Sequence, residues 1–225
     1  MPQHTVKSQH TNHDNDGEQA EHADGAKRSG RRSASSTLQR KIIERERRIL
    51  ANAFESLETD GTAVQATALV VSARRRFVIG EGKSFAYSTL LAGDLSAGLS
   101  QVTLIDGAIV RPLDILADVR NTDVLIAFSV YRYRRYTIEF SRQFRAAGGD
   151  VVAITDSLAA PICSIASVSI VVPTENTLED DSPTALVAAI HVLTELAVAS
   201  AKGARRRIDK RQKLTRALNI YFDEG

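Results

Sequence analysis

The chain has a single cysteine and no tryptophan among its 225 residues. One thiol, Cys163, cannot form an internal disulfide or a site of several thiolate ligands, which favours a reducing compartment such as the cytoplasm. No run of about 18 uninterrupted apolar residues occurs, and the first residues lack the apolar core of a signal peptide. We therefore expect neither membrane anchoring nor secretion.

An excess of charge of one sign is also missing. The formal net charge of +2 is too small to indicate nucleic-acid binding by itself, because such binding needs several cations clustered on one face. Residues 202–225 gather many Lys and Arg among spaced apolar residues, which predicts a basic C-terminal amphipathic helix. We interpret this helix as packed on its own domain or on a partner subunit. Contact with DNA through the basic ends is the alternative, and we do not expect it directly.

Residues 1–37 contain almost no large apolar side chains, which predicts a disordered polar tail. Four histidines lie there: His4, His10, His13 and His22. Their irregular spacing and the lack of carboxylate or thiolate partners at fixed offsets do not suit a metal site. We expect no metal and no organic cofactor. Residues 38–75 show apolar residues on one helical face, broken at Asp60-Gly61, and are predicted to form the N-terminal helices.

Near-continuous apolar strands alternate with helical segments over residues 76–201. Such strands are buried on both faces, as in a parallel sheet covered by helices. The predicted fold is a three-layer α/β/α domain with a five-stranded parallel sheet, doubly wound as in flavodoxin, plus flanking N- and C-terminal helices. The expected strands are 76–79, 101–105, 124–128, 151–155 and 168–172. The expected helices within this domain are 84–97, 112–119, 137–147, 161–166 and 182–201.

The strand at 76–79 runs into Gly80-Glu81-Gly82-Lys83-Ser84 and then into a helix. The two glycines let the backbone turn sharply and approach a ligand, and Ser84 lies where the N–H groups of a helix start can bind phosphate. Glycine also occurs at such turns for packing reasons, so the loop alone is a weak indication. The pattern is neither GxGxxG nor GxxxxGK[ST], which disfavours nucleotide binding of those two kinds.

A second strand end leads into residues 129–137, where Arg and Tyr alternate. Guanidinium groups make bidentate contacts with phosphate, although three Arg within four positions cannot all face one pocket. Ligands of doubly wound sheets bind beyond the carboxyl ends of the strands at the switch point of the winding order, where we expect both loops. Together the two loops predict that the ligand is a phosphorylated small molecule, and a sugar phosphate suits them best. Stacking of the Arg and Tyr side chains on nucleic-acid bases is the less favoured alternative.

Residues 76–172 resemble a SIS (sugar isomerase) domain, and the second loop is similar to that of RpiR-type phosphosugar-responsive transcriptional regulators. That loop often reads Ser-Phe-Arg-Arg-Tyr-Ser-Arg-Glu-Thr-Val-Glu, which residues 129–139 follow closely, and residues 146–157 are similar to the Gly-x-x-Val-x-x-Ile-Thr-Asp-Ser strand of the family. The resemblance implies that Ser84 and Ser129 bind the phosphate. Together with the Arg side chains of the second loop, the expected ligand-binding set is Gly80, Gly82, Lys83, Ser84, Ser129, Arg132, Arg134 and Thr137.

The chain departs from the family in two respects. The wider pattern has Ser-x-Ser-Gly-x-Thr in the second loop, whereas Tyr131, Arg132 and Arg134 stand at its second Ser, Gly and Thr, so that phosphate coordination there is lost or has passed partly to Arg. RpiR-type regulators also carry an N-terminal helix-turn-helix domain, and no recognition helix is found ahead of residue 76. A regulator of this kind would act through a partner or its basic ends, and we expect a homodimer or homotetramer.

Isomerisation between an aldose and a ketose needs a base and usually an acid, and Glu and His commonly fill these roles. The catalytic candidates are Glu81, inside the first loop, and His191, the sole histidine outside the tail. Lys83 also matches the Gly-x-Gly-Lys-Ser form of arabinose-5-phosphate isomerase-like proteins. The simpler interpretation makes Glu81 a solvated turn residue and His191 a core or interface residue. We therefore expect a regulatory or sensing protein that binds a phosphosugar, with a phosphosugar aldose–ketose isomerase as the alternative.

Overall fold

The computed structural model describes residues 15–174 and 182–221, with side chains from residue 35 onward. Two compact units divide the chain, residues 1–45 and residues 46–225, and the packing described below belongs to the second unit. The first helix, α1, spans Asn15–Thr59 and so begins well before residue 38, where we had expected the disordered tail to end. This part of the helix contains Ala, Glu, Gln, Lys and Arg, which favour helix, but also Gly25 and Gly30, which do not. Residues 1–14 of the expected tail lie outside the described residues.

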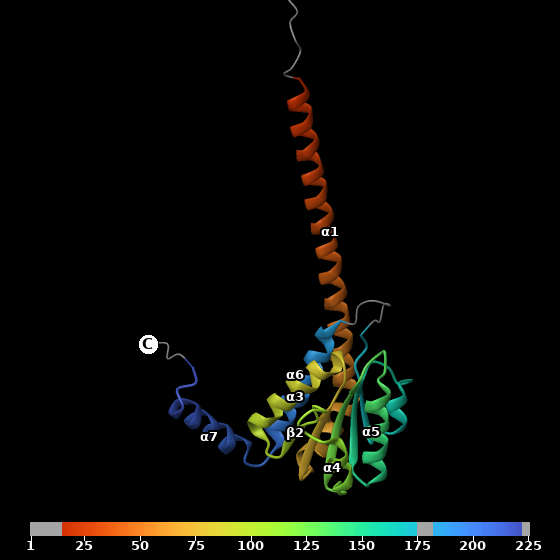
Figure 1. Cartoon of the computed structure of the whole chain (residues 1–225), viewed down its shortest axis with the longest axis vertical. Coiled ribbons are helices and arrows are strands. Elements are labelled where there is room, and N and C mark those ends of the chain that lie inside the picture. Colours follow the sequence, from red (N-terminus) through yellow and green to blue (C-terminus); the bar gives the residue numbers. More distant parts are fainter. Residues whose placement is uncertain (1–14, 175–181, 222–225) are drawn as a thin grey trace, which may run out of the picture. The chain divides into compact units, whose positions relative to one another are not determined.

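A five-stranded parallel sheet forms the centre of the second unit (Figure 1). Its strands are β1 (Arg75–Ile79), β2 (Val102–Leu104), β3 (Asp123–Ser129), β4 (Asp150–Thr155) and β5 (Val168–Val171). They lie in the order β2-β1-β3-β4-β5, and every neighbouring pair is parallel. This is the flavodoxin-like doubly wound order that the alternation of strands and helices predicted.

The helices also fall close to their expected positions. They are α2 (Thr62–Ser72), α3 (Lys83–Gly98), α4 (Pro112–Ala117), α5 (Arg135–Ala146), α6 (Pro183–Ser200) and α7 (Ala204–Ala217). The short helix expected at 161–166 is a single 3₁₀ turn, η1 (Pro161–Ser164). Proline suits the first position of such a turn because the missing N–H has no partner there.

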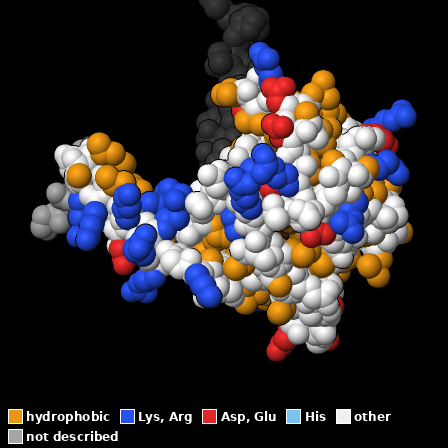
Figure 2. Space-filling model, turned by 90° about the horizontal axis from the view of Figure 1, so that it is seen from below, with side chains coloured by type: hydrophobic (Ala, Val, Ile, Leu, Met, Phe, Trp, Pro, Cys, Tyr) orange, Lys and Arg blue, Asp and Glu red, His pale blue; other side chains and the backbone are white. Residues whose placement is uncertain are grey.

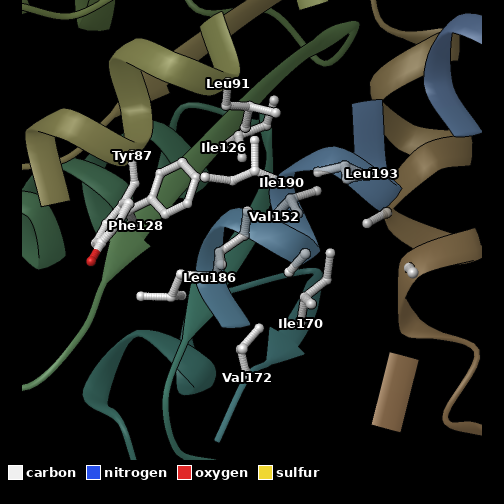
Figure 3. Close-up of a cluster of buried hydrophobic side chains, with 14 of the residues drawn as sticks. Tyr87, Leu91, Ile126, Phe128, Val152, Ile170, Val172, Leu186, Ile190 and Leu193 are labelled. Atoms are coloured by element: carbon white, nitrogen blue, oxygen red, sulfur yellow. The ribbon is translucent and has the colours of Figure 1, made fainter. Parts of the chain in front are cut away.

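Side chains on the strands alternate between two apolar layers. On β3, Val124, Ile126 and Phe128 face the layer formed with α1, α2, α3 and α6, whereas Leu125 and Ala127 face the layer formed with α4 and α5. Figure 3 shows the first layer, where strand residues meet the α6 side chains Leu186, Ile190 and Leu193. Because both layers are apolar, the central strands β1, β3 and β4 are buried on both faces and the edge strands β2 and β5 partly so, which confirms the three-layer α/β/α architecture.

Helix α6 has the length and composition of a membrane span, with a mean hydropathy of 1.5 over 18 residues. Its apolar residues, however, pack against the sheet and α2, and Leu186, Ala189 and Leu193 are almost completely buried. A core helix that is apolar all round has the same composition. The packing against the sheet therefore accounts for the buried part of α6, which is 39% of this window.

An ion pair joins the amino ends of β1 and β3. Arg75 donates to both carboxylate oxygens of Asp123, from Nε at 3.1 Å and from Nη2 at 2.6 Å, and the backbone N–H of Arg120 donates to the same carboxylate at 2.8 Å. The Asp123 side chain is completely buried, and the Arg75 side chain is 29% exposed. These contacts fix the amino-terminal edge of the sheet. The site is expected at the opposite edge, where the strands have their carboxyl ends.

Candidate functional site

The two loops singled out in the sequence follow neighbouring strands at the same edge of the sheet. Ile79 of β1 is paired with Ala127 of β3, so Gly80 and Ser129 both lie at or beyond the carboxyl ends. The sheet continues from β1 to β2 on one side and from β3 to β5 on the other. The gap between β1 and β3 is therefore the switch point of the winding order, which is the usual ligand position in open α/β sheets.

Both glycines of the first loop are required by its geometry. A Cβ at Gly80 would lie 2.5 Å from the carbonyl oxygen of Ser84, closer than atoms can approach, and Gly82 has a φ of 59°. The tight turn delivers the chain directly into α3, which begins at Lys83. Ser84 is buried in the first helical turn. The loop thus places the amino end of α3 at the switch point, where backbone N–H groups favour an anion.

Arg134 brings the second loop onto the first. A Cβ at Gly82 would lie 3.0 Å from Nη2 and 3.3 Å from Nε of Arg134, so the guanidinium lies directly against the glycine backbone. Arg134 immediately precedes α5 and so holds its charge at the start of that helix. Arg132 is exposed, as is Lys83 at the first position of α3. Of the cations expected in the site, Arg134 is the one whose guanidinium lies against the backbone of Gly82 in the first loop.

Two hydroxyl groups of the second loop are buried without an internal partner. Ser129 and Thr137 are only 2% and 1% exposed, and neither hydroxyl oxygen has a hydrogen-bond partner among the residues that the structure describes. Leaving a buried polar group unsatisfied costs about 1–3 kcal/mol. The end of β3 is held in place, because the Thr155 hydroxyl donates to the carbonyl of Ser129 at 2.6 Å. The hydroxyls of Ser129 and Thr137 thus lie beside the cationic loop, and both remain able to form hydrogen bonds with a ligand.

A cavity of about 260 Å³ opens next to these loops. It is lined by residues of three segments: Ile79, Gly80, Glu81, Gly82 and Phe85; Ile105, Asp106 and Gly107; and Tyr136. The loop after β2 and Tyr136 were not among the expected site residues. Asp106-Gly107 directly follows an expected strand, and this position at the carboxyl edge is the signal that could have indicated the loop.

The loop after β2 is held in one conformation by a carboxylate. Oδ1 of Asp106 accepts hydrogen bonds from the backbone N–H groups of Ala108, Ile109 and Val110 at 3.0, 2.9 and 3.0 Å. These donors lower the pKa of Asp106, so the carboxylate is ionised at neutral pH. The cavity therefore has a fixed acidic residue on the side of β2.

Two tyrosines near the site remain protonated at physiological pH. Burial raises the pKa of Tyr136, and the neighbouring charge of Glu81 raises it further. Burial likewise raises the pKa of Tyr133 to about 12, with further contributions from the charge of Asp156 and a hydrogen bond to it. The Tyr136 hydroxyl can therefore act as a neutral hydrogen-bond donor in the cavity, close to the Glu81 carboxylate.

The two catalytic candidates are in different environments. Glu81 lines the cavity, in the company of Tyr136. His191 is exposed on α6, and it is not among the described residues that line this cavity. Within one copy of the chain, the structure therefore does not bring this acid–base pair together in the cavity.

Residues 69–200 match the family model of the SIS domain. No curated protein matches the chain.

Several solved structures have the same fold. The sugar isomerase domain of an RpiR transcription factor from Sphaerobacter thermophilus has a TM-score of 0.69 at 24% identity, covering 77% of this chain and 97% of that one. The NanR protein of Vibrio vulnificus, solved in complex with ManNAc-6P, has a TM-score of 0.66 at 14% identity, covering 79% of this chain and 69% of that one. Phosphoheptose isomerase GmhA of Neisseria gonorrhoeae has a TM-score of 0.58 at 18% identity, covering 72% and 97%.

Proposed function

This chain belongs to the SIS domain family, and we propose that it binds a phosphorylated sugar or a related carbohydrate derivative as a regulatory or sensing protein of the RpiR type. The observation that carries the proposal is the pair of buried hydroxyls, on Ser129 and Thr137, that have no hydrogen-bond partner among the described residues. They lie at the switch point beside the amino ends of two helices. Phosphate oxygens are acceptors that such donors suit.

The charges around the site suit the two ends of a sugar phosphate. Arg134 and the starts of α3 and α5 supply cations and N–H donors to a phosphate, together with the hydroxyls of Ser84 and Ser129. The adjoining cavity carries the carboxylates of Glu81 and Asp106, which accept hydrogen bonds from hydroxyl groups. In this proposal the phosphate lies at the loops and the sugar extends into the cavity.

A sensing role is supported by the similarity of residues 129–139 to the RpiR-type loop and by the bound ManNAc-6P in the structure of NanR, which has the same fold. Within the described part of the chain, the segment ahead of β1 forms only α1 and α2. Helix α2 buries Ala63, Ala66 and Val70 in the core, so it cannot serve as a recognition helix in a DNA groove. We propose that ligand binding instead changes the association of this cytoplasmic protein with further copies of itself or with a partner.

A panel of sugar phosphates is expected to contain at least one compound that raises the melting temperature, because a ligand of the folded state stabilises that state. Ser129→Ala should remove most of this rise, since it deletes a hydroxyl assigned to the phosphate. The matched control is Ser96→Ala, whose hydroxyl is bonded to the carbonyl of Ala92 at the far end of α3. The measurement is differential scanning fluorimetry at several ligand concentrations. No rise with any compound, or equal rises in both variants, would contradict the proposal.

A phosphosugar isomerase is the second candidate, favoured by the position of Glu81 in the cavity beside a protonated Tyr136. If Glu81 is the base, Glu81→Gln should lower the rate of aldose–ketose interconversion by at least about 100-fold, the usual contribution of such a group. The matched variant is His191→Ala, because His191 does not line this cavity within one copy of the chain. Product formation is followed by chromatography of aldose and ketose phosphates. Equal activity of both variants and the wild type would remove the catalytic assignment.

A further inference from the structure

A second cavity, of about 620 Å³, lies at the amino-terminal edge of the sheet, opposite to the loops described above. It is bounded by the end of α2, the start of β1, the turn between α3 and β2, and the turn between α6 and α7. All of its charged lining residues are cations: Arg76, Lys202, Arg206, Arg207 and Lys210. No Asp or Glu is among the described residues that line it, so its side chains contribute only positive charge.

Arg76 places a buried positive charge at the inner end of this cavity. The residue is 6% exposed, and its guanidinium donates to the carbonyls of Val70, Val71 and Ser100 at 2.6, 2.9 and 3.1 Å. Burial lowers the pKa of Arg76, because the charged form has lost its water. Carbonyl groups satisfy the N–H donors but supply no full negative charge. The carbonyls of Val70 and Val71 belong to the last turn of α2 and offset part of the desolvation cost, and a nearby anion would offset more of it.

Three of the other cations belong to α7, and Lys202 lies in the turn that precedes this helix. Arg206 and Lys210 are one helical turn apart and exposed, and Arg207 is tied to α3 by a hydrogen bond from Nε to the carbonyl of Ser96 at 3.2 Å. Lys and Arg side chains gather over α7 in Figure 2. Like charges at this spacing repel one another on an isolated helix. An anion that lies between them would relieve this repulsion.

We propose that this cavity is a second anion site, which takes a compact compound bearing two or more phosphate groups. Its volume falls within the roughly 300–1,000 Å³ of small-molecule sites, and its cations are more than a single phosphate needs. Because the site lies at the opposite edge of the sheet, it is independent of the proposed phosphosugar site. An extended nucleic acid would instead contact cations along the whole of α7, including those that do not line the cavity.

The test titrates inorganic tripolyphosphate into the full chain by isothermal titration calorimetry. The variant Arg206→Ala/Lys210→Ala removes two cations from the lining, whereas Lys213→Ala/Arg216→Ala removes two from the same helix outside the lining. We expect one tripolyphosphate per chain, an affinity at least about tenfold weaker in the first variant, and a change below about twofold in the second. Ser129→Ala should bind tripolyphosphate as the wild type does, which separates this site from the phosphosugar site.

Three results would overturn the inference. Absence of binding at low ionic strength would show that the cavity takes no phosphate compound. Equal weakening in both double variants would show that tripolyphosphate is attracted diffusely to the cations of α7. A DNA duplex should then also bind, and the two double variants should lose equal affinity for it. Loss of tripolyphosphate binding in Ser129→Ala would place the anion at the carboxyl edge of the sheet. Circular dichroism should show that each variant has the α-helical content of the wild type, which excludes unfolding as the cause of any lost binding.

Discussion

Gly80→Ala is expected to abolish detectable binding of the sugar phosphate and to lower the free energy of unfolding by about 1–3 kcal/mol. The new Cβ would lie 2.5 Å from the carbonyl oxygen and 2.8 Å from the carbonyl carbon of Ser84. Because these are backbone atoms, no side chain can rotate away, and the first turn of α3 must move. That movement displaces both Ser84 and the N–H groups assigned to the phosphate. The measurements are urea denaturation and ligand titration.

The matched control for this prediction is Gly93→Ala in the same helix. A Cβ at Gly93 has no atom within 4 Å, and the residue is exposed on α3. Alanine is the better helix former there, so the variant should gain about 0.5–1 kcal/mol and bind ligand as the wild type does. Undiminished binding by Gly80→Ala would show that the tight turn at this glycine does not shape the phosphate site.

Asp123→Asn is expected to lower the free energy of unfolding by about 3 kcal/mol at neutral pH, the lower end of the range for breaking a buried ion pair. The lower end applies because the Arg75 side chain is partly exposed, whereas that of Asp123 is completely buried. The amide cannot replace the ionised carboxylate that accepts from Arg75 and from the backbone of Arg120. Chemical denaturation at pH 7 measures the loss. For comparison, Asp209→Asn removes an exposed pair with Arg205 at 3.9 Å and should cost less than about 0.5 kcal/mol.

The same pair predicts how stability depends on pH. Burial alone would raise the pKa of Asp123, but the hydrogen bonds from Arg75 and Arg120 outweigh it and hold this pKa below its ordinary value of 3.8. A lowered pKa in the folded state contributes stability above the unfolded pKa, and this contribution is lost as the pH falls through the folded pKa. Between pH 5 and the acid transition, the wild type should therefore lose more stability than Asp123→Asn. Parallel curves for the two proteins would contradict this role of the carboxylate.

The strands of the sheet could be predicted from the sequence because each strand is marked by residues close to it in the chain. Apolar runs bounded by glycine and polar turns define the strands, and each strand lies within one residue of its expected bounds. Helix α1 begins at Asn15, ahead of the apolar periodicity that starts at residue 38. The first part of this helix has almost no large apolar side chains, and apolar periodicity carries no information about such a segment.

The site was only partly accessible from the sequence. The switch point and the meeting of the two loops follow from strand order, which alternation of strands and helices predicts. Which arginine faces the first loop depends on the path of the backbone between Ser129 and α5, and three similar side chains cannot be told apart from their spacing. The cavity formed with Asp106 and Tyr136 depends on loops from three segments, and no single stretch of sequence contains them.

The most direct test of the account is isothermal titration calorimetry of the full chain with sugar phosphates and with the same sugars lacking phosphate. The account predicts that at least one phosphorylated sugar binds with one site per chain, that its unphosphorylated form binds at least about 100-fold more weakly, and that Ser129→Ala weakens the phosphorylated ligand but Ser96→Ala does not. Equal binding of a sugar with and without its phosphate, or unchanged affinity in Ser129→Ala, would contradict the assignment of the loops at Gly80 and Ser129 to a phosphate.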